Sequence, residues 1–473
     1  MLTTLLRDSR ALAALAVPLV LTQLAQVALT TTDTVMMGLL GTRELAAGGL
    51  AIVIFNQLRT MGVGLVTSVG NQIAAAAARA EQAAADAGAG GVPDAVVEAR
   101  REDVRAVVRA SMAVATLAGA AGAVLMILIG QVLVTLGQDA AVVELTQTML
   151  LALAPGLLPC LWFQAVRQFT VGMRRPQALL RITIASIAVN AGLNWVLIHG
   201  TWGLPKLGLT GIGVATSTVY LLSFVALYVS AKRDSELSPL LTLNAAKADP
   251  ATVKRLVGLG VPIAATYGSE AGFFSVTALM AGAFGPAALA AHTAVNQLVY
   301  IVFQVAVGLS HAASINVSRE LALGRTEDAR RIKNTALACA AAVMAVVGVA
   351  YLSVPGLVLR PFLDSGSDQA LTIATQLLVV TAFLQFFDCA QNIGVGLLRG
   401  LDDTKSGFRI TLIGYWAVGL PAAWLLARPL GLDTLGIWLG LLTGLATTAV
   451  LLLRRYSSSL AARSGTRSAV APA

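Results

Sequence analysis

The sequence predicts an all-α polytopic membrane protein in which twelve transmembrane helices form two pseudo-symmetric six-helix lobes. Three observations lead to this fold class. Of the 473 residues, 57% are hydrophobic and only 12% are charged, about half the charged fraction of an ordinary soluble domain. Apolar runs long enough to cross a bilayer, which takes about 20 residues, occur from end to end. Segments in the first half of the chain also resemble segments in the second.

The predicted spans are apolar runs separated by polar or charged connections. The plainest are 208–231 and 433–453, whereas several others are broken by Gly or Pro. In chain order, the twelve spans cover 11–38, 46–74, 107–135, 146–170, 180–199, 208–231, 253–282, 287–316, 334–358, 371–398, 408–427 and 433–453.

Lys and Arg are concentrated in alternate connections, which predicts the orientation because cytoplasmic loops carry the excess of these residues. With the N-terminus inside, twelve spans return the C-terminus to the cytoplasm. Basic runs such as 100–109 and 330–333 then lie inside. The outer connections hold only Arg43, Lys206, Arg360 and Arg428. The net charge of +9 is thus spread over loops rather than gathered on one face, so we expect no nucleic-acid partner.

The chain repeats itself once. VPLVLTQ at 17–23 matches VPIAATY at 261–267, and GMRRPQALLRIT at 172–183 matches GLDDTKSGFRIT at 400–411. Each match relates a span to the one six places later, so the halves are predicted to be parallel repeats, as in carriers with alternating access. The polar segment 233–252 is interpreted as a cytoplasmic linker between an N-terminal lobe at 1–232 and a C-terminal lobe at 253–473. Residues 75–106 are expected to form two short helical pieces on the cytoplasmic surface.

Enzymatic chemistry has no support in the sequence. No Lys follows a Gly, so a phosphate-binding P-loop is absent, and no Gly-x-Ser-x-Gly elbow occurs. Its three histidines are too far apart for a helix-borne metal pair, and the three cysteines lie in apolar runs. We therefore expect neither an enzyme nor a resident cofactor.

Four ionisable residues lie well inside predicted spans: Asp33, Arg59, Glu270 and Asp388. A charge at the bilayer centre costs at least about 2.5–3.5 kcal/mol, so such groups usually face a bundle interior or water. A buried salt bridge between Asp33 and Arg59 is one interpretation of the first two. Glu270 and Asp388 have no basic residue in the interior of their own spans, and we predict that this pair exchanges a proton or Na⁺.

Asn190 and Asn194 in VNAGLNWVL lie one helical turn apart on one face. Two interpretations remain open for them. They provide oxygen ligands for a cation, or they form hydrogen bonds between helices.

Taken in order, several motifs resemble the multidrug and toxic compound extrusion (MATE) family, and most closely its NorM-like branch. They are TTDTVMMGLLGTRELAAGGLA, FTVGMRRPQ, VNAGLNWVLIHG, GLPKLGLTGIGVAT, GSEAGFFSVTALMAGAFGPAALAAH, DCAQNIGVGLLRGLDDTK and YWAVGLP. The resemblance covers nearly the whole chain. It implies a monomeric secondary exporter in the lipids of the bacterial inner membrane, with both termini cytoplasmic. Such an exporter antiports bulky, often cationic organic compounds against Na⁺ or H⁺ by alternating access. A flippase of lipid-linked or polysaccharide precursors, from the same broad superfamily, is the alternative.

The resemblance also implies roles for individual residues. Glu270 matches a cation ligand in the seventh helix, Asp388 its partner in the tenth, and the two are candidate Na⁺ ligands. Asp33 matches the acid of the N-lobe site, and Asn190 an amide beside it. Some branches have an Asp at the position of Asn194, so the amide in this chain lowers the negative charge of the N-lobe site. One branch has an aromatic ligand in the C-lobe, for which the candidates are Tyr300 and Phe303. Arg59 and the long 75–106 connection depart from the family pattern.

Overall fold

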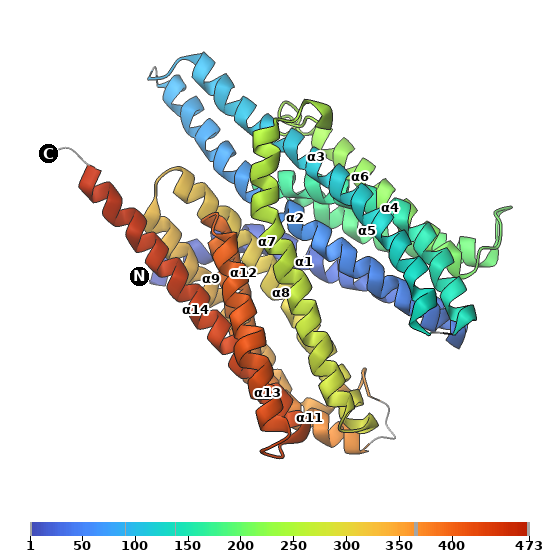
Figure 1. The fold of residues 1–473 in the computed structure, drawn as a ribbon. Coiled ribbons are helices and arrows are strands. Elements are labelled where there is room, and N and C mark those ends of the chain that lie inside the picture. The colour runs from blue at the N-terminus through green and yellow to red at the C-terminus, as the bar shows by residue number, and fades with distance from the viewer. Residues whose placement is uncertain (1, 90, 138, 364–367, 471–473) are drawn as a thin grey trace. The chain divides into compact units, whose positions relative to one another are not determined.

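The structure is a computed structural model that describes residues 2–89, 91–137, 139–363 and 368–470, and within these ranges it contains helices and no strands (Figure 1). Outside the described residues lie Met1 in the predicted N-terminal lobe, Gly90 in the 75–106 connection and residues 471–473 in the predicted C-terminal lobe. The α-helices are α1 (Leu2–Leu40), α2 (Thr42–Gly88), α3 (Asp94–Val132), α4 (Ala140–Gly172), α5 (Gln177–His199), α6 (Leu209–Arg233), α7 (Pro250–Gly282), α8 (Pro286–Ala322), α9 (Thr326–Ser353), α10 (Pro355–Leu359), α11 (Asp368–Gly400), α12 (Thr404–Leu412), α13 (Leu420–Ala427) and α14 (Asp433–Val470). Two 3₁₀ turns, η1 (Leu133–Leu136) and η2 (Ala245–Lys247), and a π-helical segment, η3 (Ile413–Gly419), complete the elements.

The predicted all-helical polytopic fold is confirmed. In the described part of the chain, eleven helical segments are long and apolar enough to cross a membrane, with α12, η3 and α13 counted together as Thr404–Ala427. Helix α7 is the counterpart of the remaining predicted span. It is 33 residues long, but polar residues near its centre, among them Thr266, Ser269 and Glu270, lower its mean hydropathy.

Chain contacts define two compact units. We call Leu21–Ala265 the N-unit, and Met1–Val20 together with Thr266–Ala473 the C-unit. Both boundaries fall inside helices, α1 and α7, and each lies three residues or fewer beyond a helix-internal proline, Pro18 or Pro262. The division into lobes at 1–232 and 253–473 with a linker at 233–252 stays a prediction.

In the N-unit, α2, α3, α4 and α6 pack around a core that includes Met37, Phe55, Met149 and Tyr220. The helical pieces expected at 75–106 are present, with a break between Gly88 and Asp94, but they are not separate short helices. These residues instead prolong α2 to Gly88 and begin α3 at Asp94, so that the two helices form one long hairpin (Figure 1). The reason is composition, because alanine has the highest helix propensity and the Ala-rich flanks continue the helices of the spans.

The segment between α6 and α7 is attached to the N-unit by hydrogen bonds. Arg175 contacts Asp234 at 2.8 Å and Glu236 at 2.6 Å. On the α3 side, Arg105 Nε donates to the Pro239 carbonyl at 2.9 Å. The segment is therefore ordered against the ends of α3 and α4.

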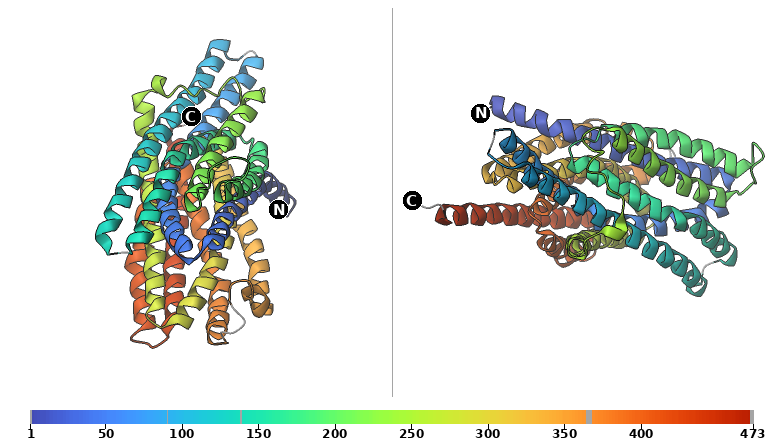
Figure 2. Two further views of the ribbon diagram at one scale, coloured as in Figure 1. Left: turned by 90° about the vertical axis from the view of Figure 1, so that its right-hand side faces the viewer. Right: turned by 90° about the horizontal axis from the view of Figure 1, so that it is seen from above.

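In the C-unit, α11 packs against α8, α9 and α14, around a core that includes Phe273, Tyr415 and Trp438. Figure 2 shows α14 as one long helix that leads toward the C-terminus. Helices α8 and α11 approach closely at Gly396, where a Cβ atom would lie 2.3 Å from Ser310 Oγ. Only glycine fits there, and this close approach forms one wall of the pocket described below.

Candidate cation and substrate sites

The N-unit holds a buried polar cluster around Asp33 of α1. Asn190 and Asn194 of α5 donate to Asp33 Oδ1 at 2.7 and 2.8 Å, and Thr216 of α6 donates to Oδ2 at 3.1 Å. Asp33 is 4% exposed and both asparagines are fully buried. The structure thus joins three residues that the sequence singled out, and the one-turn spacing of the two asparagines is what aims both amides at one oxygen.

All the donors that contact Asp33 are neutral. In the described residues, Asp33 forms no ion pair with Arg59, whose Nε donates to Asn56 Oδ1 at 3.3 Å. The salt bridge between Asp33 and Arg59, one of the interpretations of the sequence, is therefore not present in the structure. The Oδ1 atoms of Asn190 and Asn194 are buried without a hydrogen-bond partner in the same ranges. Buried acceptors normally have a partner, and oxygen atoms of this kind are the ligands of hard cations; that this cluster binds a cation or a proton stays a prediction.

The C-unit holds the two other acids. Glu270 Oε1 accepts hydrogen bonds from the Tyr415 hydroxyl at 3.0 Å and from Gln391 Nε2 at 3.5 Å. Asp388 is 5% exposed, and its Oδ1 accepts from Asn392 Nδ2 at 3.2 Å. Gln391 and Asn392 are consecutive in α11, so the two acids, one from α7 and one from α11, have neighbouring partners on that helix. That the two acids share a cation stays a prediction.

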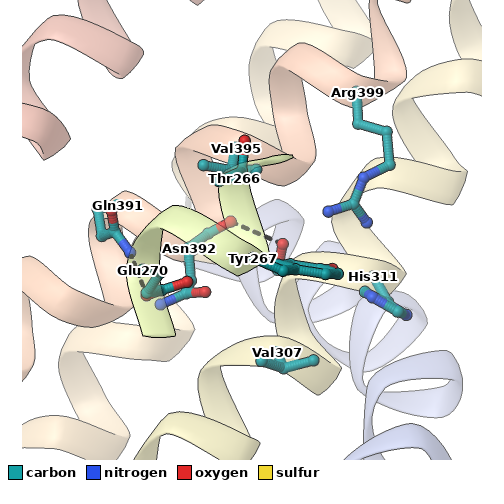
Figure 3. A pocket seen from close by; sticks show the side chains of 10 residues that line it. Thr266, Tyr267, Glu270, Val307, His311, Gln391, Asn392, Val395 and Arg399 are labelled. Atoms are coloured by element: carbon teal, nitrogen blue, oxygen red, sulfur yellow. Dashed lines mark hydrogen bonds between the residues drawn. The ribbon is translucent and has the colours of Figure 1, made fainter. Parts of the chain in front are cut away.

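A pocket opens beside Glu270. Its lining comes from α7, α8 and α11 and consists of Thr266, Tyr267, Glu270, Val307, Ser310, His311, Gln391, Asn392, Val395 and Arg399 (Figure 3). In the N-unit, a second pocket is lined by Leu29, Thr30, Asp33, Ile52, Phe55, Asn56, Leu153, Thr216 and Tyr220. Each unit therefore places an acid at the wall of a pocket.

Sequence reasoning missed Tyr415, Gln391 and Thr216 as partners of the acids, although all three lie inside the motifs quoted above. Tyr415 reaches Glu270 from η3, the π-helical segment. Its neighbour Trp416 donates to Ser269 Oγ at 2.8 Å, so two consecutive side chains of η3 contact α7. Such π-helical turns are frequent at functional sites, but no feature of YWAVG indicates one.

The aromatic candidates Tyr300 and Phe303 lie elsewhere on α8. Their rings stack at 6.4 Å between centroids, and Tyr300 is 45% exposed. Neither is among the described residues that line the Glu270 pocket, to which α8 contributes Val307, Ser310 and His311. Tyr415 is the aromatic residue that contacts Glu270. A role for Tyr300 or Phe303 in the substrate cavity stays a prediction.

Comparison with known proteins gives one family. The MatE family model matches residues 92–196 and 262–425. The chain is 34% identical over 449 residues to a probable multidrug resistance protein NorM of Pseudomonas aeruginosa, covering 94% of this chain and 88% of that relative. It is 37% identical over 456 residues to the protein of the same description in Bradyrhizobium diazoefficiens, covering 93% and 91%.

Solved structures agree in fold. A crystal structure of MATE in the bent conformation has a TM-score of 0.84 at 16% identity, over 98% of both chains. The eukaryotic MATE transporter AtDTX14 has a TM-score of 0.79 at 20% identity, over 97% of this chain and 98% of that one. The family match over most of the chain, together with the helices described above, leads to one conclusion: the chain belongs to the MatE family of multidrug efflux transporters and is a multi-pass integral membrane protein, not an enzyme.

Proposed function

We propose that this protein is a secondary active multidrug exporter that antiports bulky, often cationic organic compounds against Na⁺ or H⁺ by alternating access. It acts as a monomer in the bacterial inner membrane, with both termini in the cytoplasm. The descriptions of its relatives as probable multidrug resistance proteins support the substrate class, and the Lys and Arg pattern of the connections supports the orientation.

The observation that carries the proposal is that both units bury carboxylates whose partners are neutral. Asp33 is held by two amides and a hydroxyl, and Glu270 by a phenol and an amide. A buried negative charge is costly without a compensating cation. A site that binds a proton or Na⁺ on one side of the membrane and releases it on the other resolves this cost, and a cationic substrate competes for the same negative potential.

We assign coupling to Glu270 and Asp388 in the C-unit, with Tyr415 and Gln391 orienting Glu270. Asp33, Asn190 and Asn194 form the corresponding site of the N-unit. The flippase alternative is less favoured, because the N-unit pocket holds an acid and the C-unit pocket holds one acid together with one Arg, whereas a pyrophosphate-linked lipid calls for a mainly basic cavity.

Dye transport in inverted membrane vesicles tests the proposal. A fluorescent organic cation is followed while either a Na⁺ gradient or a pH gradient is imposed, with vesicles from cells that lack the protein as the control. We expect one gradient, or both, to drive accumulation, and the Asp388→Asn and Glu270→Gln variants to lose the response. Transport that needs neither gradient would refute antiport.

A further inference from the structure

Arg399 is a basic residue of the C-unit pocket to which the proposed function gives no role. It lies next to the last residue of α11, is 4% exposed, and lines the pocket together with Glu270 (Figure 3). Its Nε is buried without a hydrogen-bond partner in the described part of the chain, where no carboxylate pairs with the guanidinium. Leaving a buried charge unpaired is strongly unfavourable, so an anionic partner is to be expected when the protein works.

Nearby groups that could serve as this partner are already engaged. Asp403, four residues beyond Arg399, accepts from Arg455 Nε at 2.9 Å and from Ser406 N at 3.3 Å. Ser310 donates to the Asn392 carbonyl at 2.7 Å. Glu270 contacts Gln391, which precedes Arg399 by eight residues, or about 12 Å along α11. Among the described residues, Glu270 and Arg399 form no ion pair with each other.

One pocket is therefore lined by a carboxyl group, Glu270, and by a guanidinium group, Arg399. Figure 3 shows the two on opposite sides of Tyr267. Guanidinium groups bind carboxylates through two parallel hydrogen bonds, which adds geometric specificity to the charge attraction. A simple organic cation satisfies only Glu270, whereas a zwitterion satisfies both groups.

We propose that Arg399 binds the carboxylate of zwitterionic organic substrates and so determines the specificity of the pocket for them. This inference rests on the proposed export function and extends it to a substrate class. Removing the Arg399 charge is expected to weaken zwitterion export selectively and to leave the export of esterified, purely cationic analogues intact.

A matched pair of dyes tests this inference: a rhodamine with a free benzoate and its methyl ester, which keeps the cationic ring system. Efflux of both is measured in cells that contain the wild type, Arg399→Gln or Arg399→Lys. Arg409→Gln is the control, because it removes an exposed positive charge shortly after α11, outside the pocket.

We expect Arg399→Gln to raise the apparent KM for the zwitterion about tenfold or more, which corresponds to the loss of one charge-assisted contact. The ester should change less than about twofold, Arg399→Lys should be intermediate, and Arg409→Gln should resemble the wild type.

Other outcomes would refute the inference in distinguishable ways. If the wild type exports neither dye above the level of cells that lack the protein, the export function itself fails. If Arg399→Gln loses both dyes equally and melts at a lower temperature, Arg399 is a structural residue. If neither dye is affected but sulfate raises the melting temperature of the wild type and not of Arg399→Gln, the guanidinium holds a free inorganic anion. Should Arg399→Gln fail to reach the membrane, a loss of ester export in Arg399→Lys equal to that of the zwitterion would overturn the proposal.

Discussion

The Tyr415 hydroxyl donates to Glu270 Oε1 at 3.0 Å, and this contact joins a π-helical segment to the middle of α7. The ring of Tyr415 also stacks on Phe273, with 4.8 Å between centroids and an interplanar angle of 14°. At Gly414, just before it, a Cβ atom would lie 1.8 Å from Thr448 Oγ1, so η3 packs directly against α14. Tyr415 is therefore fixed on both sides, and its hydroxyl is held in place beside the acid.

Tyr415→Phe is expected to change cation coupling while the fold survives. The substitution keeps the stacked ring and removes one donor from Glu270, worth about 1 kcal/mol. The affinity of the site for its cation should change about fivefold, measured as the ion concentration at which dye transport is half-maximal. Tyr456→Phe is the matched control, because it removes a buried hydroxyl that donates to the Ala329 carbonyl and should leave the ion response intact. An equal ion response in both variants would contradict the role of Tyr415.

Asp33→Asn is expected to cut efflux sharply at a near-normal level of protein in the membrane. The amide keeps the shape of the carboxylate but cannot compensate a cation, and its own NH₂ meets the donating amides of Asn190 and Asn194. Efflux and membrane level should be measured together. Thr216→Val, which removes only the contact to Oδ2, should reduce efflux less. Unchanged efflux in Asp33→Asn would leave Asp33 without a part in transport.

The attachment of the α6–α7 segment gives a prediction about pH. Burial alone raises the pKa of Asp234, but the N–H groups of Glu236 and Leu237 and the Arg175 guanidinium outweigh it, so the net pKa lies below the usual value. The resulting stabilisation is complete above the pKa of an unfolded aspartate, about 3.9, and is lost as the pH falls through the folded value.

Hydrogen exchange of 234–249, corrected for its intrinsic pH dependence, should therefore stay constant from about pH 8 to pH 5 in the wild type. Arg175→Gln should speed exchange by an amount that corresponds to less than about 1 kcal/mol, because the ion pair is partly exposed to solvent. Equal exchange in Arg175→Gln and the wild type would mean that the other contacts of the segment suffice to hold it.

Cysteine labelling tests the orientation. In a background without the three native cysteines, Ala85→Cys in the α2–α3 hairpin and Ala246→Cys near η2 should resist an impermeant thiol reagent added to intact cells. Leu204→Cys, in a predicted outer connection, should react. All three positions are exposed in the structure, so protection reflects the membrane rather than burial. Reaction at Ala85→Cys or Ala246→Cys from outside would reverse the assigned orientation.

The sequence was sufficient where one physical signal dominated. Long apolar runs predicted the spans, because a bilayer requires them, and the spacing of Asn190 and Asn194 predicted a shared face that the structure has. It was insufficient where a contact depends on how distant helices meet. Tyr415 reaches Glu270 only through the wide turn of η3 and the close packing at Gly414, and neither leaves a pattern in the local sequence. The break at AGAGGVP was predicted, but the helices of the α2–α3 hairpin are longer than expected, because its alanine-rich flanks continue the helices of the spans.

The pair formed by Glu270 and Asp388 is expected to be the coupling site. Two buried acids whose partners are consecutive residues of α11 cannot both stay charged without a large penalty, and a bound Na⁺ or a captured proton relieves it. Inward movement of one positive charge gains about 2.3 kcal/mol per 100 mV of membrane potential, which is more than a tenfold bias. That bias is enough to drive release of a competing cationic substrate.

Asp388→Asn should therefore abolish cation-driven efflux and the effect of the ion on drug affinity, while folding survives, because the amide oxygen still accepts from Asn392. Drug binding to the purified protein should be measured with and without Na⁺, and again across pH, for Asp388→Asn and Glu270→Gln. Asp368→Asn is the control, since Asp368 is an exposed acid in the first turn of the same helix. A wild-type ion response in both site variants would move the coupling site out of the C-unit and leave the Asp33 cluster as the remaining candidate.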